Sequence, residues 1–514
     1  MTPRDAYDQL VQRSRERALL SSCLELLSWD ELTCMPRGGI AQRARQMAYL
    51  AGLLHDQATD PRLAELLAVV EDSDLVDDPL TPPAVNARVW RRNYDRLVRL
   101  PRALVQELAD VTTTSQQVWA DARQDDDFAA FLPLFAQVLQ LKRNEALCLA
   151  QDGRLYDALL QDFEPGVTAD QLQTLFAELR RELTVLLAEC EAQRPVLKPA
   201  RLRRDFPVER QRILAHSVAA AVGFDFERGR LDTTSHPFFS PIGPGDCRIT
   251  TRFSASDFGE AFFSVLHEVG HGLYEQGLDP DAAGTPMGEA PSLGLHESQS
   301  RLWENGVGRS LPFWRHFYPR VSELFHDALH DVSEAEFVWG INHVERGLNR
   351  VRADQVTYDL HVMIRFELEQ LLLTGDLAPQ DLPQAWNEKY QQTLGIAPAN
   401  DAEGCLQDGH WSSGQFGYFP TYSLGNMYSA QLLEAARRDL GNLDEPFAAG
   451  DFSPLLSWLQ KTVYSAGQRL PSAQLVQQIT GEPPGCGALV RDLRQRRAEL
   501  QLLPPRRSRG RRRS

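Results

Sequence analysis

Three features that the sequence lacks narrow the classes to which this protein can belong. None of the seven cysteines forms a C-x-x-C pair, so nothing indicates a thiolate metal site or a redox centre, and we expect buried, reduced thiols. The first twenty residues carry charges throughout and lack the apolar core of a secretory signal peptide. No stretch reaches the roughly 18 uninterrupted apolar residues of a membrane-spanning helix. We therefore expect a cytoplasmic protein that does not bind membranes.

The chain also lacks an excess of positive charge. Its 70 acidic residues outnumber the 54 basic ones, and the formal net charge is −16. An acidic body repels nucleic acid, so we expect no nucleic-acid partner. Residues 504–514 are the exception, because they contain six arginines. We expect this segment to be a disordered, solvated tail, with weak contact to an anionic partner as the alternative.

Hydrophobic residues make up 43% of the chain and charged residues 24%, as in ordinary folded proteins. Many of the apolar residues recur at three- and four-residue steps, which predicts helices. In residues 134–148, for example, one helical face consists of Leu134, Val138, Leu141 and Cys148.

One short segment has the alternation of a strand. In CRITTRF, residues 247–253, the residues at odd positions alternate with Arg248, Thr250 and Arg252, as in a half-buried strand. No repeat of roughly 20 to 50 residues indicates a solenoid. The sequence therefore predicts a mostly α protein with a small β-sheet near its middle.

The motif HEVGH, an HExxH sequence, occupies residues 267–271. On an α-helix, His267 and His271 lie one turn apart on nearly the same face, so their imidazoles can converge on one metal ion. Glu268 is rotated away by one step and can reach a water bound to that ion. With 12 histidines and 70 acidic residues in the chain, about 0.04 such matches are expected by chance. The motif therefore favours a zinc site over two unrelated core or surface histidines.

The residues around the motif predict that it lies on a helix. Asp257 and Glu260 give this helix an acidic start, and Gly277 is its expected C-terminal cap. Its expected buried stripe consists of Phe262, Leu266, Val269 and Leu273.

A catalytic zinc ion needs a third protein ligand and an open fourth position. The metzincin pattern requires a glycine at position 274 and a histidine at 277, but this chain has Tyr274 and Gly277, which excludes that class. A glutamate on a later helix is the other common solution, and Glu297 follows His271 by 26 residues. Glu297 can equally be a helix N-terminal acid that interacts with the helix dipole, and the spacing leaves both interpretations open.

Further motifs accompany HEVGH along the chain. They are HPF at 236–238, DCRIT at 246–250, HESQSR at 296–301, NRVRAD at 349–354 and GCLQDGHW at 404–411. In this order they resemble the signatures of the M32 metallocarboxypeptidases, the carboxypeptidase Taq family. The segment LLSWDELTCMPRGG at 26–39 is also similar to that family. NRVRAD departs from the family's I-R-x-x-A-D at its first position only, which keeps Arg350 in place.

The resemblance implies a zinc-dependent hydrolytic site. Glu297 becomes the third ligand beside the two histidines of HEVGH, with Co²⁺ as a substitute for Zn²⁺. Glu268 is implied as the general base that takes a proton from the attacking water and passes it to the leaving amine. A second donor to the oxyanion is expected from His410 or Tyr422.

An enzyme that removes C-terminal residues must also hold a free carboxylate. The planar fork of an arginine suits this task, because it can donate two hydrogen bonds to the two oxygens. The resemblance points to Arg248 in DCRIT and to Arg350 in NRVRAD. Taken alone, each arginine is more typical of a surface or structural ion pair.

Four other residues are candidates for a supporting role around the ligands. Asp354 and Asp408 can orient ligand histidines, although helix capping or ion pairing explains them equally well. His296 points elsewhere on its helix than Glu297 does, which favours support over ligation. Arg301 is expected to hold Glu297 or a neighbouring carboxylate in place.

By resemblance, residues 1–503 form one catalytic domain: a large, single helical body around a deep active-site groove, with the small sheet near the zinc site, and assembled as a homodimer. The implied activity releases single C-terminal amino acids, with broad specificity, from peptides with free C-termini. Two alternatives stay open, an oligopeptide endopeptidase on a similar scaffold and an inactive, metal-stabilised peptide-binding protein. Glu268 counts against the second alternative, because binding zinc does not require it.

Overall fold

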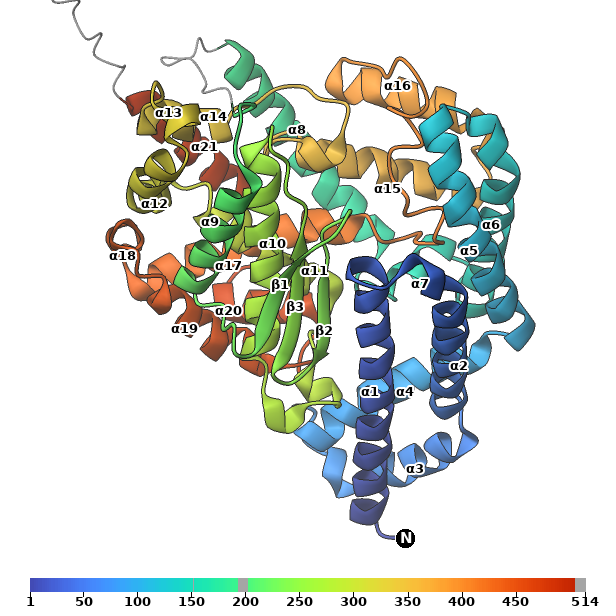
Figure 1. The fold of residues 1–514 in the computed structure, drawn as a ribbon. Coiled ribbons are helices and arrows are strands. Elements are labelled where there is room, and N and C mark those ends of the chain that lie inside the picture. Colours follow the sequence, from blue (N-terminus) through green and yellow to red (C-terminus); the bar gives the residue numbers. More distant parts are fainter. Residues whose placement is uncertain (151, 193–201, 504–514) are drawn as a thin grey trace, which may run out of the picture.

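The computed structural model describes residues 1–150, 152–192 and 202–503, most of which lie in helices. The predicted tail, residues 504–514, lies outside the described residues. In these ranges no helix is both long and apolar enough to cross a membrane. The predicted fold class is confirmed, since helices surround one small three-stranded sheet (Figure 1).

The helices divide into those before and those after the sheet. Those before it are α1 (Pro3–Thr33), α2 (Ile40–Ala58), α3 (Pro61–Glu71), α4 (Pro82–Arg99), α5 (Arg102–Asp125), α6 (Phe128–Leu149), α7 (Leu155–Leu160), α8 (Ala169–Ala192) and α9 (Val208–Ala221). Those after it are α10 (Phe258–Gly277), α11 (Leu293–Arg301), α12 (Leu311–Leu324), α13 (His326–Leu329), α14 (Glu334–Ile341), α15 (Tyr358–Thr374), α16 (Leu382–Leu394), α17 (Pro420–Leu440), α18 (Asp444–Ala449), α19 (Ser453–Thr462), α20 (Ser472–Thr480) and α21 (Gly487–Leu502).

Local sequence explains where several of these helices begin. Thr2 caps α1 through a reciprocal pair of hydrogen bonds with Asp5, just before Pro3 at the first helical position. Asp60 caps α3 by accepting a hydrogen bond from a backbone amide, and Pro61 follows it. Proline suits this first position because the N–H that it lacks has no partner inside a helix.

The sheet contains β1 (Gly229–Thr233), β2 (Phe239–Gly243) and β3 (Asp246–Thr251) in the order β1-β3-β2. Strand β3 runs parallel to β1 and antiparallel to β2. The predicted strand over residues 247–253 is thus confirmed as β3, although it ends two residues earlier. Cys247, Ile249 and Thr251 are buried as the alternation predicts, but Thr250 is buried as well. Its hydroxyl exchanges hydrogen bonds with the backbone N–H and C=O of Phe238, next to β2.

The sheet packs against α10, while α1 contacts its edge strand β2 (Figure 1). Helix α10 begins as predicted, because the side chain of Asp257 accepts hydrogen bonds from the N–H groups of Gly259 and Glu260. The whole predicted stripe along this helix is buried. The prediction for Gly277 was wrong: this residue ends the helix, and the cap is Leu278. A Cβ at Gly277 would lie 2.3 Å from the ring of Tyr464, so close packing explains this glycine.

Helix α11 packs on α10, and α17 packs on α11. Two glycines allow these approaches. A Cβ at Gly270 of α10 would lie 2.5 Å from the backbone oxygen of Gln299, and a Cβ at Gly425 of α17 would lie 2.6 Å from Cγ of Glu297. A π-helical turn, Leu302–Val307, continues α11. Turns of this kind are frequent at functional sites, because their extra residue re-aims the side chains that follow.

The buried apolar residues form one large cluster that contains residues from Ala122 to Leu500. A smaller cluster joins α1, α3 and α4 around Leu10, Leu66 and Trp90. Of the face predicted on α6, Val138 belongs to the large cluster and Leu141 is buried outside it, whereas Leu134 and Cys148 are only partly buried. The division into one domain over 1–503 and a tail stays a prediction.

The cysteines are only partly as predicted. All seven are free thiols. Cys190, Cys247, Cys405 and Cys486 are buried, whereas Cys23 and Cys34 are exposed. Both exposed thiols lie at or near α1, on whose outer side Leu19 is also exposed.

Candidate metal centre

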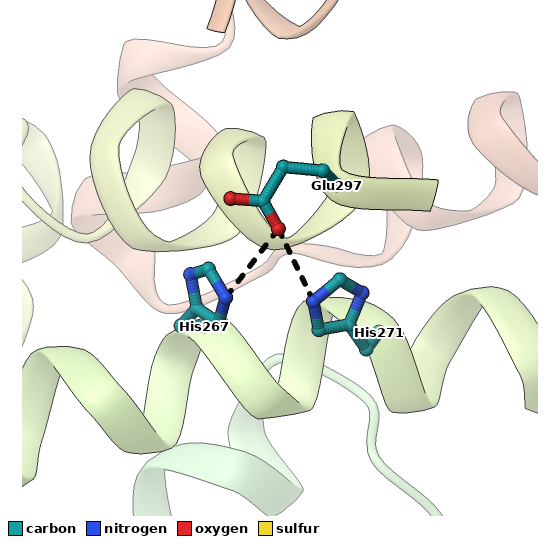
Figure 2. A group of neighbouring side chains, drawn as sticks. All are labelled: His267, His271 and Glu297. Carbon is teal, nitrogen blue, oxygen red and sulfur yellow. Dashed lines mark ion pairs between the residues drawn. The ribbon is translucent and has the colours of Figure 1, made fainter. Parts of the chain in front are cut away.

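Three predicted ligands come together between α10 and α11. The Nε2 atoms of His267 and His271 lie 3.5 Å and 3.4 Å from Oε2 of Glu297. Figure 2 shows both imidazoles pointing from α10 toward this carboxylate. Ligand atoms that sit about 2.1 Å from a shared tetrahedral ion lie about 3.4 Å from one another. Both distances to Glu297 therefore fit a zinc-like ion, and all three donor atoms lie within 4.8 Å of one another.

The carboxylate of Glu297 is held as an anion. Its Oε1 accepts a hydrogen bond of 2.7 Å from Nε of Arg301, and its Oε2 accepts one of 2.9 Å from the hydroxyl of Ser300. Burial opposes ionisation, but Arg301 and the two histidines outweigh it and lower the pKa of Glu297 well below its usual value. Glu297 is the fifth residue of α11, beyond the first turn, so the helix-dipole interpretation does not describe it. The structure places Arg301 where the sequence predicted it.

A carboxylate that the sequence did not predict supports His267. Oε2 of Glu304, in the π-helical turn, lies 3.0 Å from Nδ1 of His267, on the far side of the ring from Glu297. Arg301 and Arg309 flank Glu304 at 3.2 Å and 3.6 Å. Burial would raise the pKa of Glu304, but Arg301 and His267 lower it to about 2. Glu304 is therefore an anion that can fix the orientation of the ring.

The other predicted ligand, His271, has a second histidine as its neighbour. Nδ1 of His271 lies 2.6 Å from Nδ1 of His296, and Nε2 of His296 lies 2.9 Å from Oε1 of Glu275. The two histidine rings meet edge to edge, with their centroids 4.6 Å and their planes 29° apart, and the ring of Phe239 packs against both. His296 therefore lies beside His271, a predicted ligand. Glu275 lies four residues after His271 on the same helical face, a spacing that could have indicated it.

Glu268 lies between these groups on α10 and is buried, with 6% of its surface exposed. Burial raises its pKa to about 7, with opposing effects from the charges of His267, Glu297 and Glu304. A carboxylate with such a pKa can both accept and return a proton near neutral pH.

A second buried charge cluster surrounds Arg350. Nε and Nη2 of this arginine donate to Oδ1 of Asp408, at 3.2 Å and 2.7 Å. Arg365 donates to the other oxygen of Asp408 at 2.7 Å. The two arginines lower the pKa of Asp408 far below its usual value, although burial opposes them. The NRVRAD and GCLQDGHW motifs therefore meet in one ion-paired cluster.

Tyr358 connects this cluster to the candidate metal centre. The hydroxyl oxygen of Tyr358 accepts hydrogen bonds from Nη2 of Arg301 at 2.6 Å and from Nη1 of Arg350 at 2.9 Å. Since Arg301 also holds Glu297, one chain of contacts runs from the carboxylate of Glu297 to Arg350. No motif in the sequence marks Tyr358.

The two predicted oxyanion donors lie against each other beside this cluster. Nε2 of His410 lies 3.0 Å from the hydroxyl of Tyr422, and the guanidinium of Arg350 lies 4.8 Å from the ring of Tyr422. Burial lowers the pKa of His410 to about 3, so its imidazole is neutral.

Arg248 lies on strand β3. Among the described residues, no hydrogen bond joins it to the Arg350 cluster. Its guanidinium donates to both oxygens of Asp246 at 2.9 Å and 2.8 Å. It also packs over the ring of Trp29 in α1, 4.2 Å from the ring centre. These contacts match the structural ion pair that was the alternative interpretation.

The expectation that Asp354 and Asp408 orient ligand histidines was wrong. Asp354 accepts hydrogen bonds from the N–H groups of Val356 and Thr357, so it caps the turn before α15. Asp408 pairs with two arginines. Within the described ranges, no hydrogen bond joins either aspartate to His267 or His271. The alternatives of capping and ion pairing describe them instead.

Comparison with known proteins identifies the family. Residues 9–497 match the family model described as carboxypeptidase Taq (M32) metallopeptidase. Thermostable carboxypeptidase 1 of Thermus thermophilus is 47% identical over 509 residues, which cover 97% of this chain and 100% of the relative. Carboxypeptidase 1 of Bacillus subtilis is 36% identical over 485 residues, which cover 94% and 96%.

A solved structure agrees with these relatives. The M32 carboxypeptidase from Deinococcus radiodurans R1 matches with a TM-score of 0.92 and 39% identity, over 97% of this chain and 100% of that one. The sequence resemblance is thereby confirmed. The chain belongs to the carboxypeptidase Taq (M32) family of metallopeptidases and is a metallocarboxypeptidase, a hydrolase of peptides.

Proposed function

We propose that the chain is a zinc enzyme that releases single C-terminal amino acids, with broad specificity, from peptides with free C-termini. The observation that carries this proposal is the convergence of His267 and His271 on Glu297, with the buried carboxyl of Glu268 beside them. Two imidazoles and one carboxylate are a common donor set of catalytic zinc, and Co²⁺ accepts the same ligands.

Glu268 acts as the general base in this proposal. When bound, zinc supplies a Lewis acid that makes water a better nucleophile and polarises the scissile carbonyl. The carboxylate of Glu268 takes the proton from the attacking water and then delivers it to the nitrogen of the leaving amino acid. Its burial supports this role, because a pKa near 7 leaves part of the population ionised at neutral pH.

Arg350 binds the C-terminal carboxylate of the substrate. Its guanidinium is buried, and each terminal nitrogen keeps a second N–H beyond the bonds to Tyr358 and Asp408. Two such donors can hold a carboxylate with a defined orientation. Arg248 assists from the sheet, where Asp246 and Trp29 fix its side chain.

His410 or Tyr422 donates the second hydrogen bond to the oxyanion. The phenol of Tyr422 is the better donor when Nε2 of His410 carries the ring proton and donates it to the phenol oxygen, because the O–H of Tyr422 then stays free for the oxyanion. Arg301 and His296 support the ligands through their bonds to Glu297 and His271.

The cellular setting is a further part of the proposal. Seven free thiols suit a protein of the cytoplasm, where disulfides are rare. A homodimer is proposed from the family resemblance alone, and light scattering on the purified protein tests it.

Release of the free amino acid from an N-blocked dipeptide tests the activity, with metal content measured on the same samples. We expect the zinc-loaded wild type and the Glu323→Ala variant, altered at an exposed site on α12, to be active. Glu268→Ala should keep its metal and lose turnover by at least a thousandfold, an order expected for a general base combined with positioning. Metal binding without turnover by the wild type would instead favour a binding protein.

A C-terminally amidated copy of the dipeptide separates the proposal from an endopeptidase. The enzyme should fail to cleave it, because Arg350 loses the carboxylate that it binds. Cleavage at an equal rate would support the oligopeptide endopeptidase.

A further inference from the structure

The two ligand histidines have unequal support on the sides that face away from Glu297. His267 faces the carboxylate of Glu304 directly, at 3.0 Å. His271 faces a second imidazole, that of His296, and only beyond this ring comes the carboxylate of Glu275. A row of three groups therefore leads from the proposed metal ligand away from the site.

The direction of the hydrogen bonds in this row follows from the role of the first ring. His271 offers Nε2 to the ligand cluster, so its Nδ1 carries the proton and donates it. Nδ1 of His296 must then be the acceptor, which leaves the proton of that ring on Nε2. Nε2 of His296 faces Oε1 of Glu275 at 2.9 Å, so this carboxylate accepts the second hydrogen bond.

We propose that Glu275 is a positioning residue, which acts through His296 to fix the tautomer and the orientation of His271. This inference rests on the proposed role of His271 as a metal ligand. Glu275 lies outside the sequence motifs of the site, although its partner His296 begins the HESQSR motif.

The surroundings hold the row in this arrangement. The ring of His296 meets that of His271 edge to edge, while Phe239 and Tyr274 enclose it with ring centroids 5.4 Å and 5.1 Å away. Within the described ranges, His296 is the one side chain that a hydrogen bond or ion pair joins to the carboxylate of Glu275. If an arginine also paired with this carboxylate, His296 and the arginine would share it. Among the described residues no arginine does so, and the carboxylate of Glu275 binds His296 alone.

Zinc affinity is the property that such a row should change. Supporting bonds to a ligand histidine typically contribute ten- to a hundredfold in metal affinity. We expect Glu275→Gln and His296→Phe each to weaken zinc binding by about tenfold or more in a chelator competition assay. Glu323→Gln, the matched change at an exposed glutamate of α12, should leave the affinity unchanged.

The double variant separates the row from a plain charge effect. If Glu275 acts through His296, then Glu275→Gln adds little to the loss already caused by His296→Phe. If Glu275 acts only as a nearby negative charge, its loss is the same with and without His296, and the proposal is overturned. Unchanged affinity of either single variant overturns it as well.

A rescue variant distinguishes loss of the hydrogen bond to His271 from misfolding. In His296→Asn the side-chain amide keeps an oxygen close to the position of Nδ1, where it can accept the proton of His271. This variant should bind zinc more tightly than His296→Phe and should no longer respond to Glu275→Gln. Thermal unfolding of each apo variant shows whether the fold is intact, independently of the metal.

The same assay separates this inference from the proposed ligand set. If His271→Ala binds zinc as tightly as the wild type, then the ligand assignment fails. If His271→Ala loses zinc while Glu275→Gln binds it like the wild type, then the ligands are correct and the role of Glu275 is wrong.

Discussion

Gly270 on α10 faces the backbone of Gln299 on α11 with no room for a methyl group between them. A Cβ at this glycine would lie 2.5 Å from the carbonyl oxygen and 2.6 Å from Cα of Ser300. Backbone atoms cannot move aside as a flexible side chain can. The separation of the two helices that carry the proposed ligands is therefore set at this contact.

We expect Gly270→Ala to push α10 and α11 apart, to destabilise the fold by about 1–3 kcal/mol or more, as overpacking does, and to weaken zinc binding. Gly259→Ala on the same helix is the matched control, because its Cβ would meet nothing closer than 3.6 Å. Since alanine favours helix over glycine by up to about 1 kcal/mol, this control should be neutral or more stable. Urea unfolding and zinc titration of both variants check the prediction, and equal behaviour would contradict it.

Tyr358→Phe should be costly although it removes only one oxygen. This hydroxyl accepts hydrogen bonds from the buried guanidinium groups of Arg301 and Arg350. A phenylalanine leaves both donors unsatisfied, which costs about 1–3 kcal/mol of unfolding free energy for a buried polar group. The same change at Tyr49, which is 69% exposed, should cost little.

Peptide hydrolysis offers a second measurement on Tyr358→Phe. With Arg350 less firmly held, KM for an N-blocked dipeptide should rise more than kcat falls. A stability and a KM equal to those of Tyr49→Phe would show that the phenol oxygen does not hold the arginines.

Glu164 should make the stability depend on pH. Its buried carboxyl accepts a hydrogen bond from the N–H of Gly294, at the start of α11, but burial dominates and raises its pKa to about 8. In the unfolded chain the pKa has its ordinary value of 4.5. Between these two values the folded state holds a proton that the unfolded state releases, so stability falls as pH rises.

Glu164→Gln removes this group from the titration. The unfolding temperature of the variant, relative to the wild type, should therefore rise from pH 5 to pH 8. Glu323→Gln at an exposed position serves as the control and should run parallel to the wild type. A constant difference between Glu164→Gln and the wild type across this range would contradict the raised pKa.

The sequence predicted the parts of the site that depend on spacing along one helix. His267 and His271 are one turn apart, and that distance alone brings their Nε2 atoms to a common point. Glu297 needed the family resemblance, because its place depends on how α11 crosses α10. The burial of Cys247 and Ile249 in the sheet could also be predicted from local sequence, because alternation marks a half-buried strand.

Arg301 and His296 were predicted as supporting residues, but Glu304 and Glu275 were not, because their histidine partners lie on other elements. Glu304 reaches His267 only because a π-helical turn follows α11, and Glu275 reaches His296 across the contact of two helices. Asp354 and Asp408 show the converse error. Their place within the NRVRAD and GCLQDGHW motifs suggested a role near the ligands, while their main contacts are with backbone amides and arginines.

The double pairing of Asp408 affects how the proposed carboxylate site responds to salt. Arg350 is 5% exposed, and Asp408 and Tyr358 hold it in place before any peptide arrives. In water at ordinary ionic strength, dissolved ions largely screen the attraction between exposed charges that lie more than about 8–10 Å apart. They screen a buried charge much less. Capture of a C-terminus by this guanidinium should therefore persist in concentrated electrolyte, where arginines on the surface lose most of their attraction.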